Sequence, residues 1–170
     1  MKKIYLITTA ALVVLALASL AATPAPNLRN FVAPLSGGQE VPARDTHATG
    51  NAVFQVRADG SELEYKLIVA NIENVFASHI HCGAAGVNGP VGVTLFMGSP
   101  ASGPVNGIIA RGTITAPNPG NACGWVTLDD VLAAMHSGDT YVNVHTNDGM
   151  GDPNTGPGDF PGGEIRGQVH

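Results

Sequence analysis

Two neighbouring segments of the chain alternate between apolar and polar side chains on either side of an Asp-Gly dipeptide. The apolar positions are Ala52, Phe54 and Val56 in the first segment and Leu63, Tyr65, Leu67 and Val69 in the second. A period of two places the apolar side chains on one face of a strand. Asp59-Gly60 is a favoured tight turn between antiparallel strands. The sequence therefore predicts a β-hairpin with one buried face and one hydrated face.

Further short segments of β character are separated by loops rich in Gly and Pro. We expect strands at residues 31–35, 77–81, 91–96, 108–114, 141–146 and 164–169. The first should be an edge strand, where Pro34 is tolerated. One helix interrupts the pattern, with Thr127 as N-cap, Asp130 completing a capping box and Gly138 just beyond its end. The predicted fold is all-β: an antiparallel Greek-key sandwich or barrel with one short helix.

Three histidines lie on the expected strands, on the side away from the core. In His79-Ile80-His81 the two imidazoles share a face, about 6.6 Å apart along the strand, while Ile80 faces the interior. Valines occupy one face of residues 141–146, so His145 lies on the opposite face. Three nitrogen ligands are typical of metal sites that keep an open position, and imidazole suits copper and zinc. We predict a copper or zinc site at His79, His81 and His145.

A second interpretation of these histidines stays open at this stage. They could hydrogen-bond to neighbouring backbone and hold loops in place, because the sequence does not show that the two strands are adjacent. His47, His136 and His170 are weaker ligand candidates.

Glu164 and Arg166 share a face of the last expected strand. An ordinary cross-strand ion pair is the default interpretation of such a pattern. The alternative is that they orient a histidine ligand or guide an anion.

The composition excludes several functions. The chain of 170 residues has a formal charge of -5 at pH 7 and 5% aromatic residues. A basic stripe and stacking aromatics are lacking, so we expect no nucleic-acid partner. There is neither a G-x-S-x-G nucleophile motif nor a convincing triad, so we assign no catalytic residue and leave enzymatic activity undecided.

The first residues are typical of a secretory signal peptide. Met1-Lys2-Lys3 precedes a mostly apolar run at residues 4–20, and small residues follow before Pro24. We expect a signal peptide at residues 1–22, a linker at 23–30 and one β domain at 31–170. After cleavage the protein should be secreted or periplasmic, without stable membrane insertion. A retained membrane anchor is the alternative, because the apolar run approaches spanning length.

Export makes the two cysteines interpretable. Cys82 and Cys123 are the only pair in the chain, and an oxidising compartment favours a disulfide between them. Two free thiols, or a metal ligand at Cys82, are the alternatives.

Several runs spread over nearly the whole chain after the leader carry a specific pattern. They are Ser36-Gly37-Gly38-Gln39-Glu40-Val41-Pro42, His79-Ile80-His81-Cys82-Gly83, Asn88-Gly89-Pro90-Val91, Tyr141-Val142-Asn143-Val144-His145-Thr146 and Gly163-Glu164-Ile165-Arg166-Gly167-Gln168. Together they resemble the chordin-domain (CHRD) family, which occurs in secreted bacterial proteins and in animal chordins that bind growth factors. The resemblance implies an exported domain and supplies no biochemical activity.

A more distant resemblance is to copper-zinc superoxide dismutase. There an HxH strand and a later strand histidine hold copper on the outer wall of a Greek-key barrel, under long loops. This resemblance implies His79, His81 and His145 as copper ligands and Arg166 as an anion guide. The chain lacks a bridging histidine and an evident zinc ligand set, and its cysteine pair is placed differently, so dismutase activity does not follow.

The sequence thus predicts a secreted CHRD-like domain with a copper or zinc site, whose role would be metal binding or redox protection. The alternative is a non-catalytic extracellular module that binds a protein partner and whose histidines are structural.

Overall fold

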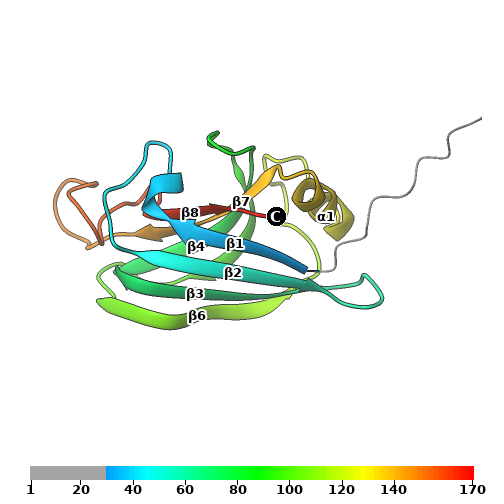
Figure 1. The fold of residues 1–170 in the computed structure, drawn as a ribbon, viewed down its shortest axis with the longest axis horizontal. Helices are drawn as coiled ribbons and strands as arrows, with labels where there is room; N and C mark the ends of the chain where they lie inside the picture. Colours follow the sequence, from blue (N-terminus) through cyan, green and yellow to red (C-terminus); the bar gives the residue numbers. More distant parts are fainter. Residues whose placement is uncertain (1–29) are drawn as a thin grey trace, which may run out of the picture.

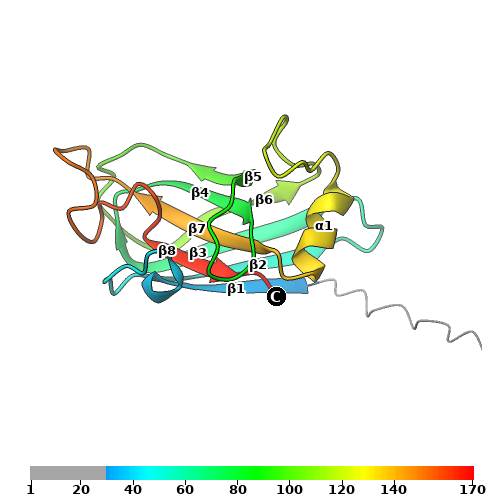
Figure 2. The ribbon, with the colours of Figure 1, turned by 90° about the horizontal axis from the view of Figure 1, so that it is seen from above.

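The computed structural model describes residues 30–170; the predicted signal peptide and residues 23–29 of the predicted linker lie outside the described residues. The strands are antiparallel and form one sheet with the neighbour order β5-β4-β7-β8-β1-β2-β3-β6. This sheet curls into a nearly closed barrel (Figures 1 and 2). The elements are β1 (Asn30–Ser36), the 3₁₀ turn η1 (Gly37–Gln39), β2 (Thr49–Val56), β3 (Leu63–Glu73), β4 (Val75–Cys82), β5 (Val91–Met97), β6 (Pro104–Ile114), α1 (Leu128–His136), β7 (Thr140–Thr146) and β8 (Ile165–Gln168).

The connections follow a Greek-key path. β3 pairs with β6, which ends the strand order on one side, and β4 and β5 form a hairpin that ends it on the other. The line along which β5 and β6 meet is the seam of the barrel. β5 and β6 approach each other there without ladder hydrogen bonds. The Tyr65 hydroxyl of β3 donates to the Leu95 carbonyl of β5 at 2.7 Å and helps to hold the seam. The order read around the barrel, with β6 beside β3 and β5 between β6 and β4, is the Greek-key arrangement. The predicted fold class is therefore confirmed.

Apolar side chains from the strands and from the helix fill the barrel interior. Phe54, Leu67, Ile80, Val142 and Ile165 are each fully buried in this single core. The predicted hairpin is confirmed as β2 and β3, which pair in register from Thr49↔Ala70 to Val56↔Leu63. The period-two pattern therefore placed the apolar face correctly.

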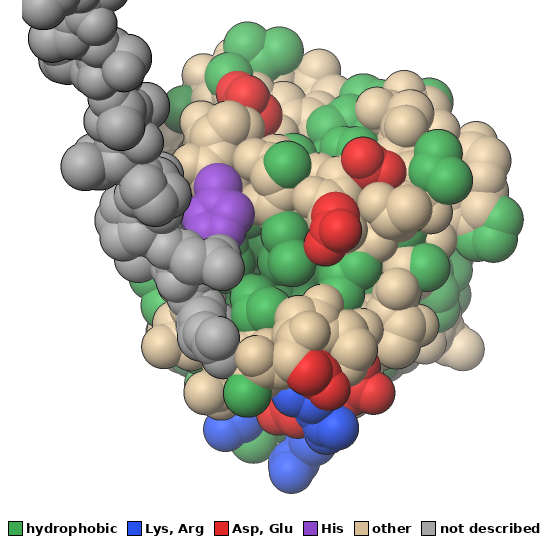
Figure 3. Space-filling model, turned by 90° about the vertical axis from the view of Figure 1, so that its right-hand side faces the viewer, with side chains coloured by type: hydrophobic (Ala, Val, Ile, Leu, Met, Phe, Trp, Pro, Cys, Tyr) green, Lys and Arg blue, Asp and Glu red, His purple; other side chains and the backbone are tan. Residues whose placement is uncertain are grey.

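The helix α1 covers one end of the barrel (Figure 1). The Thr127 hydroxyl accepts from the Asp130 amide, and the Asp130 carboxylate accepts from the Thr127 amide, so the predicted capping box is formed. Its buried side chains, Leu128, Val131 and Met135, join the core. Figure 3 looks onto this end, where hydrophobic side chains gather in the middle and acidic ones border them. Among the described residues, no helix is long and apolar enough to cross a bilayer.

The prediction that the first strand is an edge strand is wrong. β1 lies inside the sheet, between β8 and β2. Its pairing with β8 is sparse: Ser36 faces Arg166, and Val32 exchanges hydrogen bonds with His170. Pro34 lies between these two points, where the ladder does not need its missing amide hydrogen.

The predicted disulfide between Cys82 and Cys123 is present, with a Cα–Cα distance of 5.8 Å. It ties the end of β4, directly after His81, to the segment that precedes α1. The disulfide thereby fixes the C-terminal end of β4, the strand that carries His79 and His81.

Candidate metal centre

β4 and β7 are adjacent, which the sequence could not show. His79 lies opposite Asn143, Ala77 opposite His145, and His81 opposite Tyr141. Directly opposed residues of antiparallel strands share a face of the sheet. Ile80 and the valines of β7 point into the core, so the three histidines project together from the outer side of the barrel wall.

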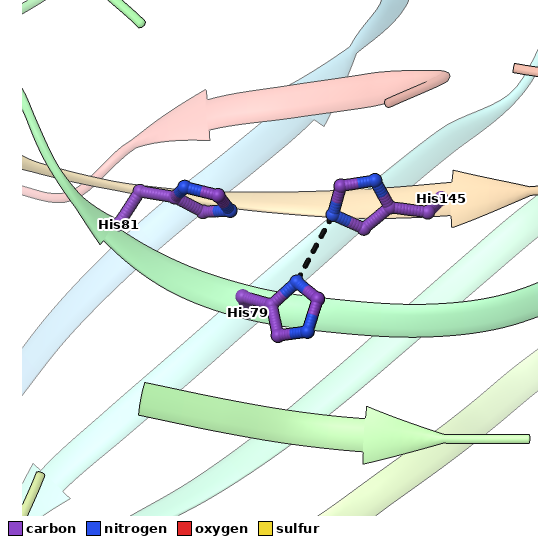
Figure 4. Close-up of side chains that lie close together, drawn as sticks. All are labelled: His79, His81 and His145. Atoms are coloured by element: carbon purple, nitrogen blue, oxygen red, sulfur yellow. Dashed lines mark hydrogen bonds between the residues drawn. The ribbon is translucent and has the colours of Figure 1, made fainter. Parts of the chain in front are cut away.

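The three imidazole rings point toward one another (Figure 4). His79 Nδ1 lies 3.0 Å from His145 Nε2, and one nitrogen atom from each ring falls within 4.8 Å of the others. Two nitrogens bound to one zinc ion at 2.0–2.1 Å are at most about 4.2 Å apart. Ring shifts below about 1 Å would therefore bring all three nitrogens within bonding distance of one ion.

Two backbone carbonyls set the tautomers of His81 and His145. His81 Nδ1 lies 2.9 Å from the Gly89 carbonyl oxygen, and His145 Nδ1 lies 2.9 Å from that of Pro161. A carbonyl only accepts hydrogen bonds, so both Nδ1 atoms carry the proton and both Nε2 atoms present a lone pair. A histidine whose other nitrogen donates to a carbonyl is the usual arrangement of a metal ligand.

The outer wall is not open to solvent at this point. His81 is 7% and His145 is 8% exposed, because loop 83–90 and loop 147–163 cover them, while His79 is half-buried. Burial is the main cause that lowers the pKa of His145 to about 4, against the hydrogen bond to Pro161. Burial also lowers the pKa of His79 to about 4, with the neighbouring histidines adding to the effect. The pKa of His81 is lowered by burial as well. The rings are therefore neutral at pH 7, as metal ligands must be.

Arg166 lies beneath the loop that orients His81. Its guanidinium donates to the Asn88 side chain at 3.1 Å and to the carbonyls of Ala84 and Val87 at 3.1 and 2.9 Å. It also stacks on the Tyr141 ring at 3.4 Å, and that ring stacks on His81 at 4.7 Å. These donors are engaged with loop 83–90, so the structure places Arg166 as an anchor of that loop.

Glu164 anchors the second loop. Its carboxylate accepts from the hydroxyls of Thr46 and Thr146 at 2.6 and 2.7 Å and from the Gly158 amide at 2.9 Å. Gly158 belongs to the loop whose Pro161 carbonyl meets His145. Neither Glu164 nor Arg166 forms the expected cross-strand ion pair within residues 30–170, because each side chain holds a loop.

The remaining histidines lie elsewhere. His47, His136 and His170 are exposed and do not join the three-histidine group. His136 packs its ring against Phe31, and the backbone of His170 exchanges two hydrogen bonds with that of Val32.

Sequence reasoning missed Glu40, which follows η1 and is 7% exposed. Burial raises the pKa of its carboxyl to about 7, against the attraction of Arg166 and Arg44. The only signal in the sequence was its place in the run Gly38-Gln39-Glu40-Val41-Pro42.

Comparison with known proteins gives one match. The sequence profile of the CHRD domain matches residues 31–152, a span that contains all three histidines and both cysteines. No curated protein and no solved structure matches the chain. The profile covers well over half of the sequence, and the protein therefore belongs to the CHRD domain family.

Proposed function

We propose that this CHRD domain binds one copper or zinc ion through His79 Nδ1, His81 Nε2 and His145 Nε2. The observation that carries the proposal is the buried Nε2 of His81, which has no hydrogen-bond partner although its ring is fixed on both sides. A buried lone pair without a donor is unfavourable unless something else occupies it. Two further imidazole nitrogens within 4.8 Å favour a metal ion as that occupant.

Two residues that are not ligands, Arg166 and Glu164, would hold the loops around such a site in place. Arg166 holds the loop that supplies the Gly89 carbonyl, and Glu164 holds the loop that supplies the Pro161 carbonyl. Both act as positioning residues, since the carbonyls keep the Nε2 lone pairs available. A bound ion would supply Lewis acidity or, if copper, one-electron chemistry.

The proposed setting is outside the cytoplasm. CHRD domains are typically extracellular, and a disulfide is stable in an oxidising compartment. Cleavage of the predicted signal peptide at residues 1–22 would release the domain as a secreted or periplasmic protein. Its role there would be metal binding or redox protection.

A second candidate function is an extracellular protein-interaction module without catalysis. The observation that favours it is the outer face of β2, β3 and β6, where Val53 is 37% and Ile108 is 46% exposed on either side of Ile68. Apolar side chains gathered on a hydrated face are typical of contact surfaces. This function does not conflict with a metal site on the opposite part of the sheet.

Metal analysis tests the proposed metal site. The purified mature protein is stripped with EDTA, loaded with Cu²⁺ or Zn²⁺, desalted and analysed for bound metal, beside His81→Ala and His145→Ala. His47→Ala is the matched control, because that histidine is exposed and outside the group. One ion per chain in the parent and the control, lost in both site variants, supports the metal site. A parent that retains no metal refutes it and leaves the interaction module.

A further inference from the structure

Three buried acceptor atoms without hydrogen-bond partners belong to side chains that gather beside the histidines. Among residues 30–170 they are Glu40 Oε1, Asn143 Oδ1 and His81 Nε2. Their side chains are 7%, 3% and 7% exposed. Most buried polar atoms in native proteins are hydrogen-bonded, so three unpaired acceptors in one place require an explanation.

The topology brings these atoms together. Asn143 lies opposite His79 on β4 and opposite Arg166 on β8, in the middle of the polar outer face. The Asn143 side chain also lies within interaction distance of the His81 ring.

Gly163 brings Glu40 to the same place. Its φ is 127°, and a Cβ there would collide with Glu40 Oε1 and lie 2.9 Å from Asn143 Nδ2. The two polar side chains therefore meet over the bare face of Gly163, where a side chain would separate them.

The Val41 amide interacts with the Glu40 carboxylate, but among residues 30–170 no hydrogen bond reaches Glu40 Oε1, Asn143 Oδ1 or His81 Nε2. Arg166 attracts the Glu40 carboxylate by charge, yet its hydrogen bonds go to Asn88 and to two loop carbonyls. A metal ion held by the three histidines would occupy His81 Nε2 and leave Glu40 Oε1 and Asn143 Oδ1 without partners. The chemistry that complements these acceptors is that of a small molecule with several hydrogens to donate.

We propose that Glu40 and Asn143 form the acceptor wall of a small-ligand position next to the three histidines. It takes a molecule with two or more O–H or N–H hydrogens, and water in the resting protein. In the metal-loaded protein this small molecule would be a fourth ligand of the ion, and this part rests on the proposed function. In the metal-free protein the hydrogen bonds to Glu40 and Asn143 alone would hold it. The site would accordingly be an open one, able to exchange a small ligand, and not a closed structural site.

The first test needs neither metal nor a variant. A high-resolution crystal structure of the EDTA-treated protein should show an ordered water within hydrogen-bond distance of both Glu40 Oε1 and Asn143 Oδ1. Density without a water at both atoms overturns the proposal.

The second test uses the Cu²⁺-loaded protein and its effect on the relaxation of water protons. The copper-loaded parent should increase the relaxation rate of water protons more than the zinc-loaded protein does. Glu40→Leu and Asn143→Leu should each at least halve this excess relaxation rate, because they remove acceptors without a large change in size. Glu64→Leu is the control, since that carboxylate is exposed on β3. Metal content and the thermal midpoint are measured for each variant. An excess that survives both site variants overturns the fourth-ligand part. A parent that binds no copper refutes the proposed function, and the crystal structure of the metal-free protein then decides the hydrogen-bonding part alone.

Discussion

Acidification of the metal-free protein should reduce its stability through His145. The pKa of this ring is about 4 in the folded protein, against an ordinary value of 6.5. A group whose pKa is depressed by folding contributes stability that is present above 6.5 and lost as the pH falls through 4. By linkage, the lowered pKa of this ring reduces the free energy of unfolding by about 0.2 kcal/mol at pH 7 and by about 2.6 kcal/mol at pH 4.5. Acidification from pH 7 to pH 4.5 therefore costs about 2.4 kcal/mol through this ring. His79 adds to the loss in the same direction.

The assay is urea unfolding in EDTA at several pH values between 4.5 and 7, followed by the fluorescence of Trp125, with the disulfide kept oxidised. His145→Gln removes the titrating ring, so its free energy of unfolding should depend less on pH than that of the parent. The exposed His47→Gln is the matched control and should follow the parent. Equal pH dependence in the parent and His145→Gln would refute the argument that burial keeps this ring neutral.

Three further predictions concern groups around the site. In EDTA, Glu40→Gln should be more stable than the parent at pH 8.5, by up to about 3 kcal/mol. The reason is that a carboxyl whose pKa is raised from 4.5 to about 7 destabilises the folded protein increasingly as the pH rises above 4.5, so the difference in urea unfolding should fall below about 1 kcal/mol at pH 5. Arg166→Met should cost roughly 3 kcal/mol by leaving loop carbonyls unpaired, and hydrogen exchange should become faster in loop 83–90; unchanged exchange there contradicts the anchoring role. Replacing Cys82 and Cys123 together by Ser should cost about 4 kcal/mol for a closed loop of this length, and a thermal midpoint equal to that of the parent would contradict it.

Local patterns in the sequence were sufficient for much of the fold. The hairpin of β2 and β3 follows from alternation and a turn, and the start of α1 follows from Thr127 and Asp130. The outward direction of the three histidines follows from the period of a strand. Each of these inferences depends on residues close in sequence, where geometry fixes the outcome.

The environment of the histidines could not be predicted in the same way. It depends on which strands are neighbours and on backbone carbonyls, which every residue carries. The Gly89 and Pro161 carbonyls have no signature in the sequence, although they set the tautomers of two rings. The edge assignment of β1 failed for a related reason, because Pro34 is tolerated wherever a ladder is interrupted and not at an edge alone.

The two interpretations of the histidines differ in what they require of each ring nitrogen. Histidines that only hold loops in place would need a partner for every buried nitrogen, and Nδ1 of His81 and of His145 have one in a loop carbonyl. His79 Nδ1 and His145 Nε2 pair with each other at 3.0 Å, but His81 Nε2 remains buried and unpaired. An apolar ring stacked on Tyr141 would fill the same space without this cost. A purely structural role thus explains the loops but leaves His81 Nε2 without a partner, which the proposed metal ion would supply.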